Sequence, residues 1–217
     1  MTRAEAVTFV KHLLFEDAAT TGIASTANLN TTIDLANKSI WRKAISQQPS
    51  AFATRSTVSY VAANDGYDLS TSLKPYIIMR VEVNNGGSWL PVEPVAFNEQ
   101  EDYDSTYNQP QGGYPSFYVV EGQTLRLLPR PATDQSVRLT VVPAYVALAA
   151  DATELLSGKF TEFHDLVCYE AERILRAKDE APDVFKPIRD EMKRDFMRFL
   201  GTRTTYRPHT ISEVPFA

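Results

Sequence analysis

Apolar residues at helical spacing mark the N-terminal part of the chain. They recur at intervals of three and four residues over residues 7–14, and Thr2 followed by Glu5 forms a capping-box sequence that favours a helix start. A second run with the same period extends from about Thr31 to Gln48 and stops at Pro49, because proline cannot continue a helix. The pattern therefore predicts two N-terminal helices joined by a loop over residues 20–29.

The middle of the chain has the period of a β-sheet. Apolar and polar residues alternate from Tyr76 to Val83, so a strand there would place Ile77, Met79, Val81 and Val83 on one face. The turn sequence at residues 84–87 predicts a hairpin with a strand over residues 89–95. A second hairpin is predicted over residues 116–128 and a further strand over residues 137–145. Short strands at this spacing are typical of a small sandwich or barrel.

Helical spacing resumes in the last third of the chain. One run begins near Phe160, and another begins near Lys186 with Pro187 in its first turn and ends at Gly201. The last run places five large apolar residues on one face, namely Phe185, Ile188, Met192, Phe196 and Phe199. The residues beyond it contain two prolines and no period, so they are expected to form an extended tail.

These elements predict an α+β fold with an insertion. The N- and C-terminal helices would pack as a small helical bundle, and an antiparallel β-sandwich or barrel-like domain would be inserted between them. The expected boundaries are residues 1–56 for the N-terminal helices, 57–147 for the inserted β domain, 148–200 for the C-terminal helices and 201–217 for the extended tail. A hydrophobic fraction of 43% is sufficient for a sizeable core.

Composition excludes several classes of function. The net charge of −5, from 27 acidic and 22 basic side chains, disfavours a surface that binds nucleic acid by neutralising phosphates. The single cysteine, Cys168, cannot form an internal disulfide and is compatible with a reducing cytosol. No stretch approaches the roughly 20 apolar residues that span a bilayer, and the N-terminal segment carries acidic residues unlike a signal peptide. We therefore expect a soluble protein without a membrane partner.

No catalytic, cofactor-binding or metal-binding signature is recognised. The histidines His12, His164 and His209 fall in separate segments without a second ligand at metal spacing. Cys168 lies in a predicted packed helix, where a lone cysteine is more often a small buried hydrophobe than a nucleophile. The chain also lacks a nucleophile elbow, a phosphate-binding loop and a dinucleotide fingerprint. We expect no cofactor and no enzymatic activity.

An acidic and aromatic segment is the first candidate contact surface. Its candidate residues are Glu99, Glu101, Asp102, Tyr103, Asp104 and Tyr107. The carboxylates could ligate a divalent cation, but the segment lacks the glycine and the spacing of a calcium loop, which favours a solvated loop. In a pore the same charges would repel passing DNA. Because no basic residues lie nearby, the tyrosines favour contact with a protein, such as a tail component, over stacking on bases.

The tail is the second candidate contact surface. It combines anchor-type side chains with charge, as docking peptides do, in Arg203, Tyr206, Arg207, Pro208, Ile211, Val214 and Phe216. A frayed terminus is the alternative interpretation. Fully stretched, the tail would reach roughly 50 Å, enough to cross onto a neighbouring protein.

The order of these elements resembles that of the head-tail connector, or portal adaptor, proteins of tailed bacteriophages. The resemblance rests on the N-terminal helices, GQTLRLLPRP followed by VRLTVVPAY, the helix FTEFHDLVCYEAERILRA, a further helix and an extended end. It implies a homo-oligomeric ring, commonly of twelve subunits, beneath the portal protein, with the tail docked on the portal. It further implies contacts with tail or nozzle proteins, a lumen through which DNA passes without specific binding, and a place in the virion neck after assembly in the host cytoplasm.

Three classes of function remain compatible with the sequence. The first is a structural, non-enzymatic head-to-tail adaptor. The alternative is another phage neck or tail protein whose β-type module binds a protein or a glycan. The third is a hydrolase that uses Glu101 and Asp102 of the acidic segment.

Overall fold

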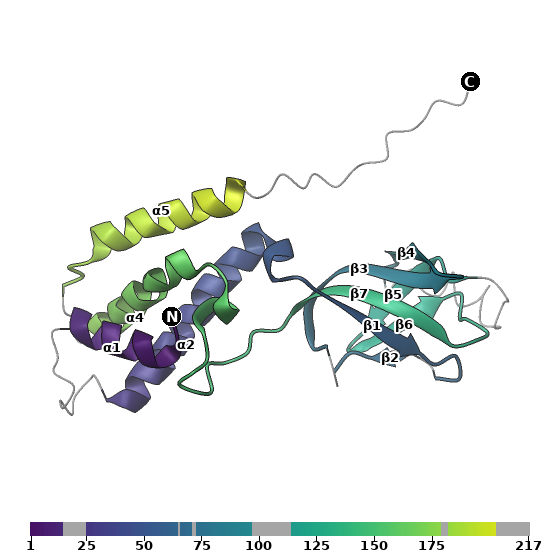
Figure 1. The fold of residues 1–217 in the computed structure, drawn as a ribbon, viewed down its shortest axis with the longest axis horizontal. Helices are drawn as coiled ribbons and strands as arrows, with labels where there is room; N and C mark the ends of the chain where they lie inside the picture. The colour runs from purple at the N-terminus through teal and green to yellow at the C-terminus, as the bar shows by residue number, and fades with distance from the viewer. Residues whose placement is uncertain (15–24, 65, 71–72, 97–113, 179–181, 203–217) are drawn as a thin grey trace, which may run out of the picture. The chain divides into compact units, whose positions relative to one another are not determined.

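The structure, a computed structural model, describes residues 1–14, 25–64, 66–70, 73–96, 114–178 and 182–202. The chain divides into two compact units. Residues Met1–Gln48 and Tyr145–Ala217 form the helical unit, and residues Pro49–Ala144 form the β unit. The β unit is therefore an insertion in the chain of the helical unit (Figure 1).

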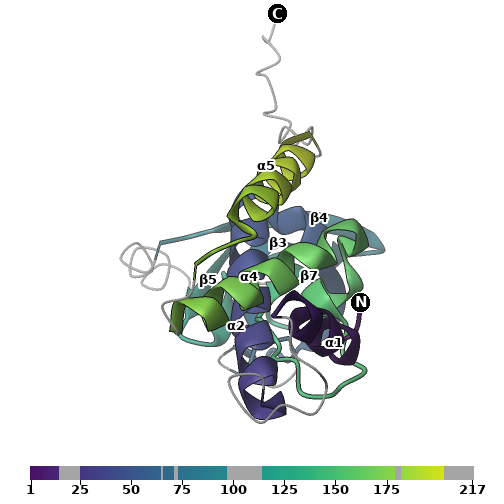
Figure 2. The same cartoon turned by 90° about the vertical axis from the view of Figure 1, so that its left-hand side faces the viewer.

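The described part of the helical unit contains four α-helices. They are α1 (Arg3–Leu13), α2 (Thr26–Gln47), α4 (His164–Lys178) and α5 (Lys186–Thr202), with the short 3-10 segments η3 (Leu155–Gly158) and η4 (Thr161–Phe163) before α4. Helix α4 packs on α1 and α2, and α5 packs on α2 and α4 (Figures 1 and 2). The core includes Val10, Ile33, Ile40, Leu166, Val167, Ala171, Phe196 and Leu200. Burial of these apolar side chains is the main stabilising term for a bundle of this kind.

The helix starts follow their capping residues. The capping box of Thr2 and Glu5 is present at α1, as predicted. Helix α2 begins earlier than predicted, because the Ser25 hydroxyl accepts a hydrogen bond from the Asn28 N–H and caps residues that were expected to be a loop. Helix α4 begins at His164 rather than near Phe160, because Phe160 adopts a left-handed φ of 54°.

Helix α5 begins at Lys186 as predicted, but one member of its expected apolar face is exposed. Ile188 is 46% exposed, whereas Arg189 is only 3% exposed. The guanidinium of Arg189 donates to Asp183 at 2.8 and 2.5 Å, and its Nε lies 3.7 Å from a carboxylate oxygen of Glu170. These ion pairs bury Arg189, whereas Pro187, Ile188 and Asp190 beside it are exposed.

The β unit is a seven-stranded, nearly closed barrel preceded by the 3-10 segment η1 (Pro49–Phe52). Its strands are β1 (Thr54–Tyr60), β2 (Tyr67–Asp68), β3 (Pro75–Asn85), β4 (Ser88–Pro94), β5 (Phe117–Glu121), β6 (Thr124–Leu128) and β7 (Gln135–Pro143). They lie in the order β1-β7-β3-β4-β5-β6-β2 (Figure 1). Neighbouring strands are antiparallel except β4 and β5, which are parallel, so the sheet is mixed. Both predicted hairpins, β3–β4 and β5–β6, are present.

Strand β3 departs from the simple alternation that its sequence predicts. Its register on β7 shifts between Pro75 and Ile77 and again between Ile78 and Arg80, so Tyr76 and Met79 are extra residues in two β-bulges. The prediction that Met79 shares the face of Val81 was therefore wrong. Met79 is 40% exposed, and Ile78 packs against the barrel core in its place.

The barrel core is formed by the inward faces of the strands. It contains Tyr60, Leu69, Val81, Val83, Val92, Tyr118, Leu125, Leu127, Val137, Leu139 and Val141. The predicted fold class, α+β with terminal helices and an inserted barrel-like β part, is thereby confirmed. The extended tail of that prediction lies outside the described residues.

Candidate assembly surfaces

Both contact segments that the sequence predicts lie outside the described residues. The first contains Glu99, Glu101, Asp102, Tyr103, Asp104 and Tyr107, and the second contains Arg203, Tyr206, Arg207, Pro208, Ile211, Val214 and Phe216. Their roles in contact with a tail component, a channel or the portal stay predictions. The surfaces that the structure does describe come from the body of each unit.

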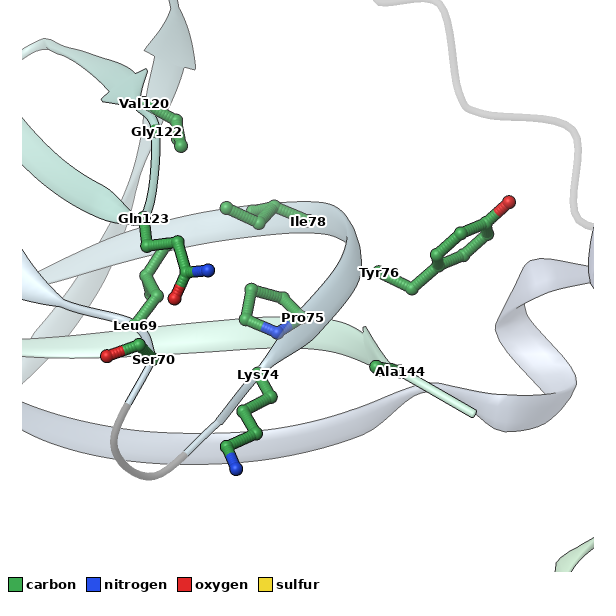
Figure 3. A pocket seen from close by; sticks show the side chains of 10 residues that line it. All are labelled: Leu69, Ser70, Lys74, Pro75, Tyr76, Ile78, Val120, Gly122, Gln123 and Ala144. Atoms are coloured by element: carbon green, nitrogen blue, oxygen red, sulfur yellow. The ribbon is translucent and has the colours of Figure 1, made fainter. Parts of the chain in front are cut away.

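The β unit carries a groove at one end of its barrel. The groove encloses about 840 Å³ and is lined by Leu69, Ser70, Lys74, Pro75, Tyr76, Ile78, Val120, Gly122, Gln123 and Ala144 (Figure 3). Pro75, Ile78 and Gln123 project into the space between the strands, whereas Tyr76 stands apart from the other lining residues. Its volume lies within the range of small-molecule and side-chain pockets, roughly 300–1,000 Å³. The groove could seat an apolar anchor from another molecule.

The backbone around Lys74 fixes the position of one wall of this groove. Lys74 has a left-handed φ of 37°, its N–H donates to the Leu69 carbonyl at 2.8 Å, and its carbonyl accepts from the Ala144 N–H at 2.9 Å. The segment before β3 is thus tied both to the β2 side and to the end of β7. The sequence gives no sign of the groove, because only the fold brings residues 69–78 and 120–123 together.

In the helical unit, His164 and Cys168 are structural residues of the core. The Lys159 carbonyl can only accept, so His164 donates to it from Nε2 at 2.9 Å, and Nδ1 accepts from the Met1 amine at 2.8 Å. Burial lowers the pKa of His164 below its usual 6.5. Burial also raises the pKa of the Cys168 thiol to about 12, so the reactive thiolate is scarce at neutral pH. The interpretation of Cys168 as a small buried residue is confirmed.

A buried ion network joins α4 to α5. The carboxylate of Glu170 accepts from Arg173 at 2.8 Å and lies 2.7 Å from Lys193 Nζ on α5. Burial raises the pKa of Glu170, but the hydrogen bonds from Arg173 and Lys193 outweigh it, and the net pKa is lowered. The neighbouring Glu172 pairs with Arg176, yet burial holds its pKa above the usual value. The network makes the attachment of α5 dependent on charge.

The second half of α5 attaches through aromatic rings. Phe196 and Phe199 of α5 meet Phe160 and Phe163, with ring centroids 5.0 to 6.0 Å apart. Edge-on and tilted contacts of this kind stabilise beyond the area that they bury. The helix that leads into the predicted docking tail is therefore held to the bundle by ion pairs at its start and by an aromatic cluster at its end.

The described residues offer a limited range of chemistry. Among them, no three histidine, cysteine or acidic side chains are grouped so that they could hold a metal ion. In the same part of the chain, no helix has the length and apolar character needed to cross a membrane. The features that the described residues do offer are the groove of the β unit and the ion network and aromatic cluster that hold α5.

Comparison with known protein families gives a match over nearly the whole chain. The sequence model of a family described as SU10 adaptor protein matches residues 1–211, which include the whole β unit and the four described α-helices. No curated protein matches the chain.

Proposed function

Because this chain belongs to the SU10 adaptor protein family, a family of phage adaptor proteins, we propose that it is the head-to-tail adaptor of the virion neck. Membership makes the chain a virion component that contacts other virion proteins. In the proposal it forms a ring beneath the portal protein, links the capsid portal to the tail, and acts without enzymatic chemistry. The match over residues 1–211 is the observation that carries this proposal.

The division of the chain into two units supports a ring. A closed ring of identical subunits needs two different, complementary patches on each subunit, so that every contact repeats by rotation. A helical unit and a β unit offer unlike surfaces for that purpose. We infer a ring of twelve subunits from the resemblance to portal adaptors. The net charge of −5 suits a lumen through which DNA passes without being bound.

The partners are divided between the tail and the β unit. Residues 203–217, with Tyr206 and Phe216 as anchors, would dock on the portal. The β unit, through the groove around Ile78 and through the acidic segment at residues 99–107, would receive tail or nozzle proteins. A groove with an apolar floor and a lysine at its rim suits an apolar anchor that carries a nearby acidic group.

Portal docking can be tested by removing the tail. The chain that lacks residues 203–217 should keep its circular dichroism spectrum and melting temperature, because the described core lies before residue 203. It should lose binding to immobilised portal protein in interferometry. The full-length variant with Tyr206 and Phe216 changed to alanine should behave in the same way, whereas a control with Thr204 and Thr205 changed to alanine should bind normally. Unchanged affinity of the truncated chain would refute tail docking.

Ring formation needs a separate measurement. In negative-stain images, portal mixed with the full-length chain should show an added ring of density below the portal. Portal mixed with the chain that lacks residues 203–217 should not. An absence of the added ring with the full-length chain would contradict the adaptor role itself.

The groove favours a second candidate function within the virion. A neck or tail protein with a β-type binding module would use the groove to bind a protein or a glycan. If this candidate is right, Ile78→Glu should abolish binding to the tail component or glycan. The unchanged chain, mixed with portal, should add no ring of density. Val61→Glu, at another partly exposed apolar site on the β unit, is the matched control.

A further inference from the structure

The two edges of the β-sheet are protected very differently. Strands β1 and β2 end the strand order. Strand β2 has only two residues, and a very short edge strand is a common protection against unwanted pairing. Strand β1 pairs with β7 over all seven of its residues without a register shift, and its sequence TRSTVSY contains no proline. Its other edge pairs with no described strand and borders the gap that keeps the barrel from closing, so it offers a regular row of backbone donors and acceptors there.

The register places three arginines on the outer face beside this edge. Residues Val58 on β1, Leu139 on β7 and Val81 on β3 point into the barrel core, so their neighbours in sequence point outward. Across the three strands, Arg55 lies beside Thr140, and Thr140 lies beside Arg80. In the next outward row, Thr57 lies beside Arg138, and Arg138 lies beside Glu82. The β-bulge at Met79 keeps Arg80 in register with this outer face.

This face carries positive charge in an acidic protein. Arg80 is half-exposed and lies 2.9 Å from Glu82, while Arg138 lies 4.0 Å from Glu82 and 3.9 Å over the ring of Trp89. The single carboxylate of Glu82 is shared by both guanidinium groups. Arg55 is exposed and has no acidic partner among the described residues. The outer face of β1, β7 and β3 thus carries three arginines, Arg55, Arg80 and Arg138, and one glutamate, Glu82.

One hydroxyl on this face lacks a partner. Thr140 Oγ1 is buried and makes no hydrogen bond within the described residues. It lies in the row between Arg55 and Arg80, where neighbouring strands are about 4.8 Å apart. Because the neighbouring side chains cover this oxygen, a partner on the outer face would meet the flanking guanidinium groups rather than the hydroxyl.

We propose that the open edge of β1 is a docking site for an extended, acidic segment of a partner protein, which adds to the sheet as an eighth strand beside Arg55. The added strand hydrogen-bonds to the backbone of residues 54–59, and a carboxylate on its outward face pairs with Arg55 across the strands. Thr54, Thr57 and Val58 are β-branched, which favours a stable extended edge. This inference does not depend on ring formation.

A peptide partner fits this edge better than nucleic acid does. Strand addition uses the alternating N–H and C=O groups of a peptide backbone, which DNA lacks. Glu82 lies within the face, and the chain carries a net charge of −5. The closely spaced phosphates of DNA would be repelled by these negative charges, whereas a single carboxylate placed beside Arg55 would be repelled much less.

The test uses the full-length chain and a short fluorescent peptide in which glutamate alternates with valine. We expect saturable binding by fluorescence anisotropy. The same peptide with N-methylated backbone amides on alternate residues should lose binding, because it cannot hydrogen-bond along one edge. A peptide with lysine in place of glutamate should also bind more weakly. Arg55→Glu should weaken binding of the acidic peptide by about tenfold, because it replaces an attractive cross-strand pair with a repulsive one.

The control variant is Arg42→Glu, which makes the same charge change on an exposed position of α2 and should leave binding unchanged. Arg55→Ala should weaken binding by a smaller factor than Arg55→Glu, and melting curves of both variants should match the parent. The proposal is overturned if the acidic peptide does not bind, if the N-methylated peptide binds equally well, or if Arg55→Glu has no effect. Displacement of the peptide by a short DNA duplex at stoichiometric concentration would instead identify a nucleic-acid surface.

Discussion

Asn37 of α2 accepts a hydrogen bond through Oδ1 from the backbone N–H of Leu156, at 2.9 Å, and both residues are buried. The same side chain donates through Nδ2 to the hydroxyl of Tyr145, also at 2.9 Å. Leu156 and Ser157 adopt left-handed φ angles of 50° and 56°, a conformation that L-residues avoid. Asn37 therefore holds the segment before α4 in a shape that its own sequence does not favour.

Asn37→Ala should destabilise the helical unit. The substitution leaves the Leu156 N–H without its partner in a buried site and removes the donor to Tyr145, so we expect a loss of about 2–3 kcal/mol in the free energy of unfolding. Urea unfolding measures this loss, and Lys43→Ala at an exposed position of α2 should change stability by less than about 0.5 kcal/mol. Equal effects of the two variants would show that the hydrogen bond contributes little.

Ser157→Gly should stabilise the protein. The Ser157 side chain is exposed, so glycine removes no packing, and it relieves the steric cost of the left-handed φ. After the larger loss of chain entropy for glycine, the expected gain is about 0.5–1 kcal/mol. Leu156→Gly relieves the same strain but removes a fully buried side chain, so it should destabilise instead. Thermal melts of the two variants should shift in opposite directions.

Stability should fall as the pH is lowered below 6.5, and His164 should contribute to that fall. Burial lowers the pKa of His164, and the charge of the Met1 amine acts in the same direction. Between the lowered folded value and 6.5, the unfolded chain binds a proton that the folded chain does not, so protonation favours unfolding. Above 6.5 both states are neutral at this residue, and the contribution of the group is constant.

The comparison of two histidine variants isolates this effect. His164→Gln removes the titrating group, so the difference in unfolding free energy between about pH 7 and about pH 5 should shrink relative to the parent. His12→Gln, at an exposed position of α1, should retain the pH dependence of the parent. If His164→Gln keeps the full dependence, other groups account for it.

Glu170→Gln should loosen the attachment of α5. The neutral amide cannot form an ion pair with the ammonium of Lys193 or with the guanidinium of Arg189. The charge of Arg189 then stays buried beside it without its carboxylate partner. Loss of one member of a fully buried pair costs about 3–5 kcal/mol, and the partial exposure of Lys193 reduces our expectation to about 2 kcal/mol. Urea unfolding gives the value, and Glu191→Gln on the exposed side of α5 serves as the control. A loss of the same size in both variants would assign it to general charge rather than to this network.

The elements that the sequence predicted correctly are those in which the spacing of apolar residues stays regular along the whole element. Strand β6 and the start of α5 occur where the pattern places them, because Thr124–Leu128 follows a glycine turn and Pro187 fits only a first helical turn. The first turn of α2 was missed because Ser, Thr and Asn are as common in loops as at a helix start. Only the Ser25 cap in the folded chain distinguishes the two.

The contact surfaces were harder to predict than the fold. Each bulge in β3 moves one residue out of the alternation, and no local signal at Tyr76 or Met79 announces it. Arg189 occupies a buried position because its ion partners come from other segments, which a helical pattern cannot reveal. The groove at Ile78 and the outer face that carries Arg55, Arg80 and Arg138 form only because strands distant in the sequence pair with one another.

The β unit begins and ends at neighbouring strands. Strand β1 is its first strand and β7 its last, and Thr54 lies opposite Val141 in the sheet. An insertion whose ends emerge side by side can be exchanged for another without altering the register of the host helices. The β unit can therefore vary in size or sequence without a change in the packing of the helices, provided that β1 and β7 remain paired at its two ends.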